Sequence, residues 1–450
     1  MNNNVITKQE KDITDALQNK INIINTSINH IVDEVYNIQL YKNLLNDFIL
    51  KHSNELHDEF KSIVNKIDSS IEIINSKSYL LEVNKLTKIV KTNSGNFVEI
   101  STPMHSPKTK ESILLNNGIY ENAKTNNDEY HEYVQDVELI NEIIIDVNKI
   151  NFNVNNYENK KILAIAVYEI FLINVDLKKI GINCESMKKF IFQVSLHYYN
   201  NPYHNFKHAV SVIQFIHLLI NKIEIRKYFS DFEVFGLLVA ALVHDIGHPG
   251  HTNLFEINNK SHLALKYNDK SVLENHHCSL TFYIIHSKEI NLFENLNQQN
   301  FSIVRNMIIE CVLATDMKHH TELVKNLEDK FFSGCTCETQ QDRILLAKIL
   351  LHIADLSNQI RPFDISYQCS IALKNEFSNQ IKKEEQLNLP TQEYMKFTSN
   401  KSFYSSEYYF SSNVVKPMWN LLVEIFPELN EYYDNLNSNI NKWKELLDNA

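Results

Sequence analysis

The sequence predicts an all-α protein, and three observations support this prediction. The 450 residues include only 7 glycines and 8 prolines, too few for the many turns of a β-sandwich. From about residue 135 onward, apolar segments of helical length alternate with short polar connections, and no paired strand pattern is present. Residues 10–90 contain neither glycine nor proline, as expected of long helices.

The first 90 residues are predicted to be a helical extension. Apolar side chains recur there at spacings of four and three: Ile24, Ile28, Ile31, Val35 and Ile38. Two interpretations remain open. The seam could form a coiled coil that joins a homodimer through residues 10–90, or an amphipathic hairpin that packs on the rest of the chain.

Residues 91–134 have the composition of a linker, and a helical domain is predicted for residues 135–447. The linker contains the pairs Thr102-Pro103 and Ser106-Pro107 together with clusters of asparagine. Within the domain, residues 231–243 (DFEVFGLLVAALV) and 342–354 (DRILLAKILLHIA) are predicted to be buried helices, the first capped by Asp231.

Charge and composition exclude several classes of protein. The chain has 44 Lys and Arg against 55 Asp and Glu, a formal charge of −11 without a basic stripe, so a nucleic-acid partner is not expected. The longest apolar runs fall short of the roughly 20 residues of a transmembrane helix. No signal peptide is recognised, and six scattered cysteines form no paired framework, so we expect a cytoplasmic protein.

Histidines and carboxylates gather at four places where a helical core would not favour them. These are YHNFKH at 203–208, HDIGHPG at 244–250, ENHH at 274–277 and HIAD at 352–355. Asp245 and Asp355 each follow a strongly apolar helix, and an unpaired buried carboxylate is costly. No lysine or arginine is adjacent to either one, so converging imidazoles and carboxylates predict a divalent-metal site.

These motifs identify a resemblance. YHNFKHA, HDIGHPG, YNDKSVLENHH, LATDM and HIADLSN occur in the order typical of the class I 3′,5′-cyclic-nucleotide phosphodiesterases, within the HD superfamily of metal phosphohydrolases. The similarity extends from about Val137 to Trp443 and implies a compact multi-helix catalytic domain.

The resemblance also implies a mechanism. It makes His208, His244, Asp245 and Asp355 the ligands of a tightly bound Zn2+, and Asp245 would also reach a second metal, Mg2+ or Mn2+. A hydroxide activated by the two metals would attack the phosphorus, and His204 would be the general acid that protonates the 3′ oxygen. Four further residues would orient ligands and waters: His248, Glu274, His277 and Thr315.

For the base, the resemblance implies a clamp between Phe410 and Leu373, with Tyr203 and Asn358 also in the substrate site. The family's glutamine position holds Glu407, which is a departure. An ionised carboxylate only accepts hydrogen bonds, and guanine offers donors at N1 and N2. The segments NQIRP (358–362) and ENHHC (274–278) also resemble the cGMP-selective branch, so cGMP is favoured and cAMP is the alternative.

A second departure is Gly247, where the family commonly has an acidic residue. Two other functions remain open: an HD-type phosphohydrolase that acts on noncyclic nucleotides, and a noncatalytic cyclic-nucleotide sensor. Turnover of a panel of nucleotides distinguishes all three.

Overall fold

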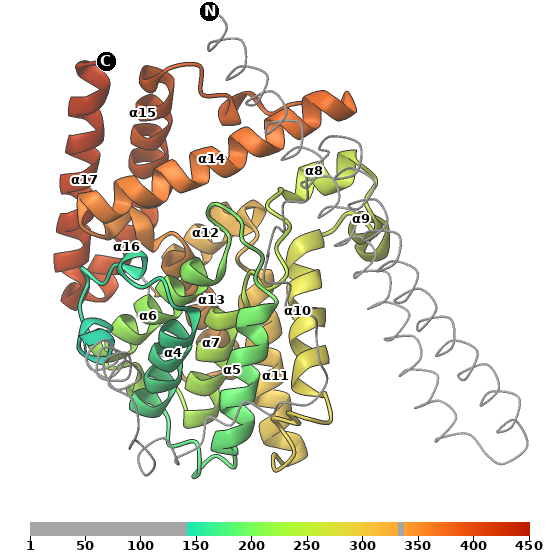
Figure 1. The fold of residues 1–450 in the computed structure, drawn as a ribbon. Helices are drawn as coiled ribbons and strands as arrows, with labels where there is room; N and C mark the ends of the chain where they lie inside the picture. The colour runs from blue at the N-terminus through green and yellow to red at the C-terminus, as the bar shows by residue number, and fades with distance from the viewer. Residues whose placement is uncertain (1–141, 332–336) are drawn as a thin grey trace, which may run out of the picture. The chain divides into compact units, whose positions relative to one another are not determined.

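The computed structural model describes residues 142–331 and 337–450, and within them every regular element is a helix (Figure 1). The all-α prediction is therefore confirmed for this part of the chain. The extension predicted for residues 1–90, the linker at 91–134 and the first residues of the domain lie outside the described residues.

The order of the α-helices is α4 (Lys160–Asn174), α5 (Cys184–Leu196), α6 (Phe206–Lys222), α7 (Asp231–Val243), α8 (Asn253–Asn258), α9 (His262–Tyr267), α10 (Val272–Ile285), α11 (Gln298–Leu313), α12 (His320–Phe331), α13 (Gln340–Asp355), α14 (Phe363–Leu387), α15 (Asn400–Tyr409), α16 (Lys416–Ile425) and α17 (Asn430–Asp448).

Helix α7 lies at the centre of the core. All its residues from Glu233 to Val243 are buried, and it packs against α6, α11 and α13. Its N-cap is Ser230 rather than the expected Asp231: Ser230 and Glu233 form a reciprocal capping box, and Asp231 is the first helical residue. Asp231 instead pairs with Arg226 at 2.6 Å.

The same packing gathers the ends of three helices. Helix α6 packs against both α7 and α13, and His208 in its first turn lies beside His244 and Asp355 at the ends of the other two. His208 belongs to that first turn, His244 and Asp245 follow α7, and Asp355 ends α13. The motifs are therefore brought together by helices whose apolar faces pack in the core.

A C-terminal layer holds α14, α15 and α17, drawn in orange and red in Figure 1. Between α15 and α16 the chain widens into a π-helical turn over Phe410–Val415. Pro417, at the start of α16, has no N–H and cannot bond the carbonyl one turn earlier, which accounts for the irregular turn at this point. Phe410 and Glu407 lie at this irregularity.

None of the helices in the described ranges combines the length and apolar character that a bilayer crossing demands.

Candidate metal centre and active site

Four predicted ligands converge in one cluster. His208, His244, Asp245 and Asp355 each offer a donor atom, and these atoms lie within 4.8 Å of one another. The Nε2 atom of His208 is 3.0 Å from Oδ1 of Asp355 and 3.2 Å from Nε2 of His244. The Nε2 atom of His244 is 3.1 Å from Oδ2 of Asp245. Residues separated by up to 147 positions thus meet at one point.

The donor atoms suit a divalent cation. The Nδ1–H of His244 donates to the carbonyl of Ala241 at 2.9 Å, so in the neutral ring the lone pair is on Nε2 and faces the carboxylates. No described lysine or arginine forms an ion pair with Asp245 or Asp355. Nitrogen lone pairs that face anionic oxygens require a cation between them, and this donor set is one that zinc accepts.

The pKa values of the cluster show that its imidazoles and carboxylates interact strongly with one another. Burial lowers the pKa of His244, but Asp245 and Asp355 outweigh burial and raise that pKa well above its usual value. Burial raises the pKa of each carboxyl, but His244 overcomes this effect and holds both pKa values below their usual range. The side chain of Asp355 is 22% exposed, less buried than its position after an apolar helix suggested, so the centre is open on that side.

His204 lies beside the cluster and is held by Glu376. Its ring centroid is 5.7 Å from that of His208, and its Nδ1 is 2.5 Å from Oε1 of Glu376. The other oxygen of Glu376 accepts the backbone N–H groups of Tyr203, at 2.9 Å, and His204, at 3.0 Å. Burial lowers the pKa of His204, but Glu376 raises it to a net value of about 9.

Sequence reasoning missed Glu376. Its position on α14, three residues after the predicted Leu373 and therefore on the same side of the helix, was the available signal. That signal is weak, because α14 also carries a buried Glu384 and an exposed Glu385, and the three glutamates look the same in sequence. Only the fold brings Glu376 to His204, across 172 positions.

Two of the predicted orienting residues lie against other residues of the candidate site. His248 stacks on His204, with centroids 4.2 Å apart. The Nδ1–H of His277 donates to the carbonyl of Ile246 at 2.6 Å, which turns Nε2 to within 3.7 Å of Asp245. Burial lowers the pKa of His277 to about 4, so this ring is neutral.

Glu274 and Thr315 make their hydrogen bonds elsewhere. Both oxygens of Glu274 accept from Asn253, and burial, followed by the charge of Asp316, raises the pKa of Glu274 to about 7. The hydroxyl of Thr315 donates to the carbonyl of Val312 at 2.8 Å. Their predicted orienting role stays a prediction.

Gly247 suits its backbone. Its φ is +74°, and a Cβ there would lie 2.8 Å from Leu280 and 3.1 Å from His276. Its N–H donates to the carbonyl of His197 at 3.0 Å. A side chain at this position would be strained, which explains locally why this chain has glycine rather than an acidic residue.

The predicted base-binding residues lie just before α6, on the turn after α13, on α14 and around the π-helical turn. Tyr203, Asn358, Leu373 and Phe410 are half-buried, whereas Glu407 is only 9% exposed. The Oε2 atom of Glu407 accepts from Ser370 Oγ at 2.8 Å and from Gln359 Nε2 at 3.3 Å. Gln359 in turn accepts from Ser411 at 2.7 Å. Burial raises the pKa of Glu407, and the two donors partly offset this.

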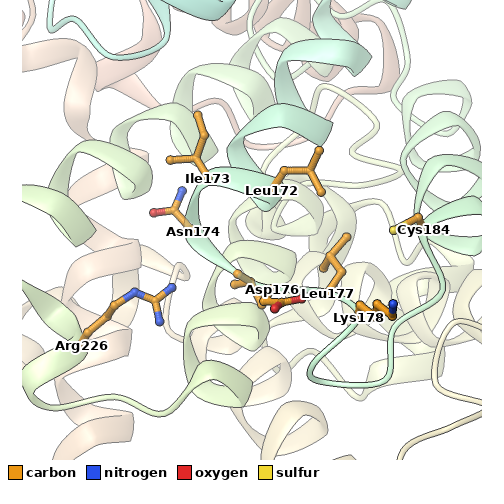
Figure 2. A pocket seen from close by; sticks show the side chains of 9 residues that line it. Leu172, Ile173, Asn174, Asp176, Leu177, Lys178, Cys184 and Arg226 are labelled. Carbon is orange, nitrogen blue, oxygen red and sulfur yellow. The ribbon is translucent and has the colours of Figure 1, made fainter.

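A separate cavity of about 440 Å³ lies between the end of α4 and the start of α5, away from these residues. Figure 2 shows its lining side chains, which include Leu172, Ile173, Asp176, Lys178, Cys184 and Arg226. None of the predicted site residues lines it.

The fold and the His/Asp centre define an all-α protein with a candidate hydrolytic metal site. The family model described as 3′5′-cyclic nucleotide phosphodiesterase matches residues 203–436, just over half of the chain, and the chain belongs to this family.

Two curated relatives are similar to this chain. The Drosophila melanogaster protein named high affinity cGMP-specific 3′,5′-cyclic phosphodiesterase 9A is 34% identical over 258 residues, covering 57% of this chain and 17% of that protein. The Homo sapiens protein of the same name is 27% identical over 378 residues, covering 84% and 62%. The chain thus spans less than two thirds of the length of either relative.

A solved structure is similar as well. The phosphodiesterase domain of the RhoPDE fusion protein from the choanoflagellate Salpingoeca rosetta is 34% identical, with a TM-score of 0.65, and covers 67% of this chain and 96% of that domain. This likeness agrees with the all-α fold of the described residues.

Proposed function

We propose that this chain hydrolyses a 3′,5′-cyclic nucleotide to the 5′-monophosphate and prefers cGMP to cAMP. The observation that carries the proposal is the cluster of His208, His244, Asp245 and Asp355 beside a histidine that is paired with a buried carboxylate. Membership of the family and the cGMP-specific names of the similar fly and human proteins support it.

The four-residue centre is proposed to hold zinc, and a second site that shares Asp245 is proposed to hold magnesium or manganese. When bound, these cations would neutralise the cyclic phosphate and lower the pKa of the attacking water. The chain's own part is to keep both Nε2 lone pairs and both carboxylates directed at one point. Helix packing holds this arrangement before the substrate arrives.

His204 is proposed to be the general acid. With a pKa of about 9, its imidazole is protonated at neutral pH. Glu376 holds the proton at Nδ1, so Nε2 is the atom that can donate to the leaving 3′ oxygen. The imidazole side chain is 23% exposed, which leaves it accessible to a bound substrate.

The preference for cGMP is proposed to rest on the free oxygen of Glu407. Ser370 and Gln359 both donate to Oε2, and none of the described residues donates to Oε1. Held in this way, Oε1 presents a fixed acceptor that suits the N1–H and N2–H of guanine and opposes the N1 lone pair of adenine.

Glu407→Gln is expected to shift this preference towards cAMP. The amide oxygen should take the place of Oε2, where Ser370 and Gln359 donate, and the amide NH2 would then face the base. The ratio of kcat/KM for cGMP to that for cAMP should fall by roughly 5–150-fold, the cost of one mismatched buried polar group. Glu424→Gln, at an exposed position on α16, is the matched control. An unchanged ratio would show that Glu407 does not read the base.

Initial rates of the purified chain test the function itself. Cyclic nucleotides should be hydrolysed, with cGMP faster than cAMP, and a chelator should stop the reaction. Faster turnover of noncyclic nucleotides would favour the HD-type alternative. Tight nucleotide binding without turnover would favour the sensor.

Dimerisation through residues 10–90 is retained as a proposal from the helical seam, and a cytoplasmic location as a proposal from the six scattered cysteines. A monomeric mass of the full chain in solution would contradict the first, and secretion of the full chain from cells would contradict the second.

A further inference from the structure

A second group of metal-binding side chains lies next to the four-residue centre. His204, His248 and Glu376 each offer a donor atom within 4.8 Å of the other two, and none of them belongs to that centre. Two imidazoles and one carboxylate are a ligand set that zinc accepts while a fourth position stays open. These three side chains could therefore bind a metal ion as well as hold the proton of His204.

Its backbone is held in place from several sides. Asn201 Nδ2 donates to the carbonyl of His204 at 2.8 Å and to that of His248 at 2.7 Å, which fixes the two histidine loops relative to each other. Glu376 is anchored through Oε2 by the N–H groups of Tyr203 and His204, which leaves Oε1 facing Nδ1 of His204. A cation would find three ligands on a preformed scaffold.

The charges also suit a cation. Burial raises the pKa of Glu376, but the effect of His204 is larger and lowers that pKa to a net value of about 2. Glu376 is therefore an ionised carboxylate. Burial and the neighbouring His204 hold the pKa of His248 well below its usual value, so its ring is neutral. The Glu376 side chain is only 4% exposed, whereas that of His204 is 23% exposed and leaves a path from solvent.

Three features make this group weaker than the four-residue centre. The 2.5 Å between His204 Nδ1 and Glu376 Oε1 must widen to roughly 3.3 Å to admit zinc at ordinary bond lengths. The N–H of Gly250 also donates to Nδ1 of His248 at 3.0 Å, and this favours the tautomer with its proton on Nε2. The group also offers three protein ligands rather than four.

The geometry points to an additional, inhibitory zinc site formed by His204, His248 and Glu376. Zinc bound there takes the place of the Nδ1 proton that His204 shares with Glu376. Donation from Nε2 would then leave an imidazolate instead of a neutral ring, so His204 becomes a much weaker acid. Nitrogen ligands favour zinc over magnesium, so magnesium does not substitute. The inference that zinc binds here is based on the geometry alone. Only the inference that it inhibits hydrolysis rests on the proposed function.

Zinc titration of the metal-free full chain tests the site. The wild type is expected to bind one weaker equivalent beyond those of the four-residue centre, as counted by calorimetry and by metal analysis. His204→Ala and Glu376→Gln should each lose that one equivalent and keep the tighter binding. The control His251→Ala removes a nearby histidine that is in neither ligand group, and it should bind as the wild type does.

Zinc added to the magnesium-supplied wild type beyond the tight equivalents should lower the rate of cyclic-nucleotide hydrolysis at least tenfold, and added magnesium should not. Equal zinc stoichiometry in the wild type and both variants would overturn the inference, as would loss of the tight equivalents from a folded Glu376→Gln variant. A wild type that binds the extra zinc but hydrolyses no nucleotide would reject the proposed function and leave this site standing.

Discussion

Asp355→Ala is expected to lower kcat/KM by roughly a thousandfold or more and to remove the tightly bound metal in the same step. Oδ1 of Asp355 lies 3.0 Å from His208 and 3.3 Å from His244, so the variant loses the carboxylate that both imidazoles face. The remaining ligands could not balance the charge of a divalent cation as well. Rates and metal content of the same purified sample measure both effects.

Asp364→Ala provides the matched control, because Asp364 is an exposed aspartate in the first turn of α14. It should keep both activity and metal. If Asp355→Ala retained either its metal or its rate, the assignment of the centre would be wrong.

His204→Asn is expected to lower kcat by about 10²- to 10⁴-fold with unchanged occupancy of the tight metal site. His204 is outside the four-residue ligand group, so the loss should fall on proton donation rather than on metal binding. Metal analysis of the variant, together with kcat for the preferred cyclic nucleotide, separates these two causes. Loss of the tight metal from a folded variant would contradict the acid role.

Glu376→Gln tests the same proposed acid role through the pKa of His204. It keeps the imidazole but removes the charge that raises the pKa of His204 to about 9, so the effect of burial would then dominate and lower that pKa. Because the acid must be protonated, the alkaline fall of kcat/KM should move to lower pH. An alkaline limb that stays in place would show that His204 is not the group that titrates.

Local patterns in the sequence were sufficient to predict the fold class and a divalent-metal site made of histidines and carboxylates, and the predicted ligands do lie together in one cluster. The apolar run 231–243 coincides with α7, and 342–354 lies within α13. Asp245 and Asp355 could be singled out because each comes directly after such an apolar run, and a buried carboxylate needs a partner wherever it is placed. The capping residue of α7 was wrong by one position, since both Ser230 and Asp231 are good caps and only the backbone distinguishes them.

The partners of the site residues could not be predicted in the same way. Glu376 reaches His204 across 172 positions, and Ser370 and Gln359 reach Glu407 across 37 and 48. These contacts depend on the angle and register at which α14 lies against the rest of the domain, and no local repeat encodes that register.

The sequence by itself determined which residues are helical, which faces are buried and which side chains can bind a cation, because periodicity and chemistry act within one or two turns. Tertiary structure alone decided that Glu376 holds His204, that one oxygen of Glu407 is already occupied and that His248 lies against His204. Each of these facts depends on the packing of separate helices, where a shift of one turn would exchange one partner for another.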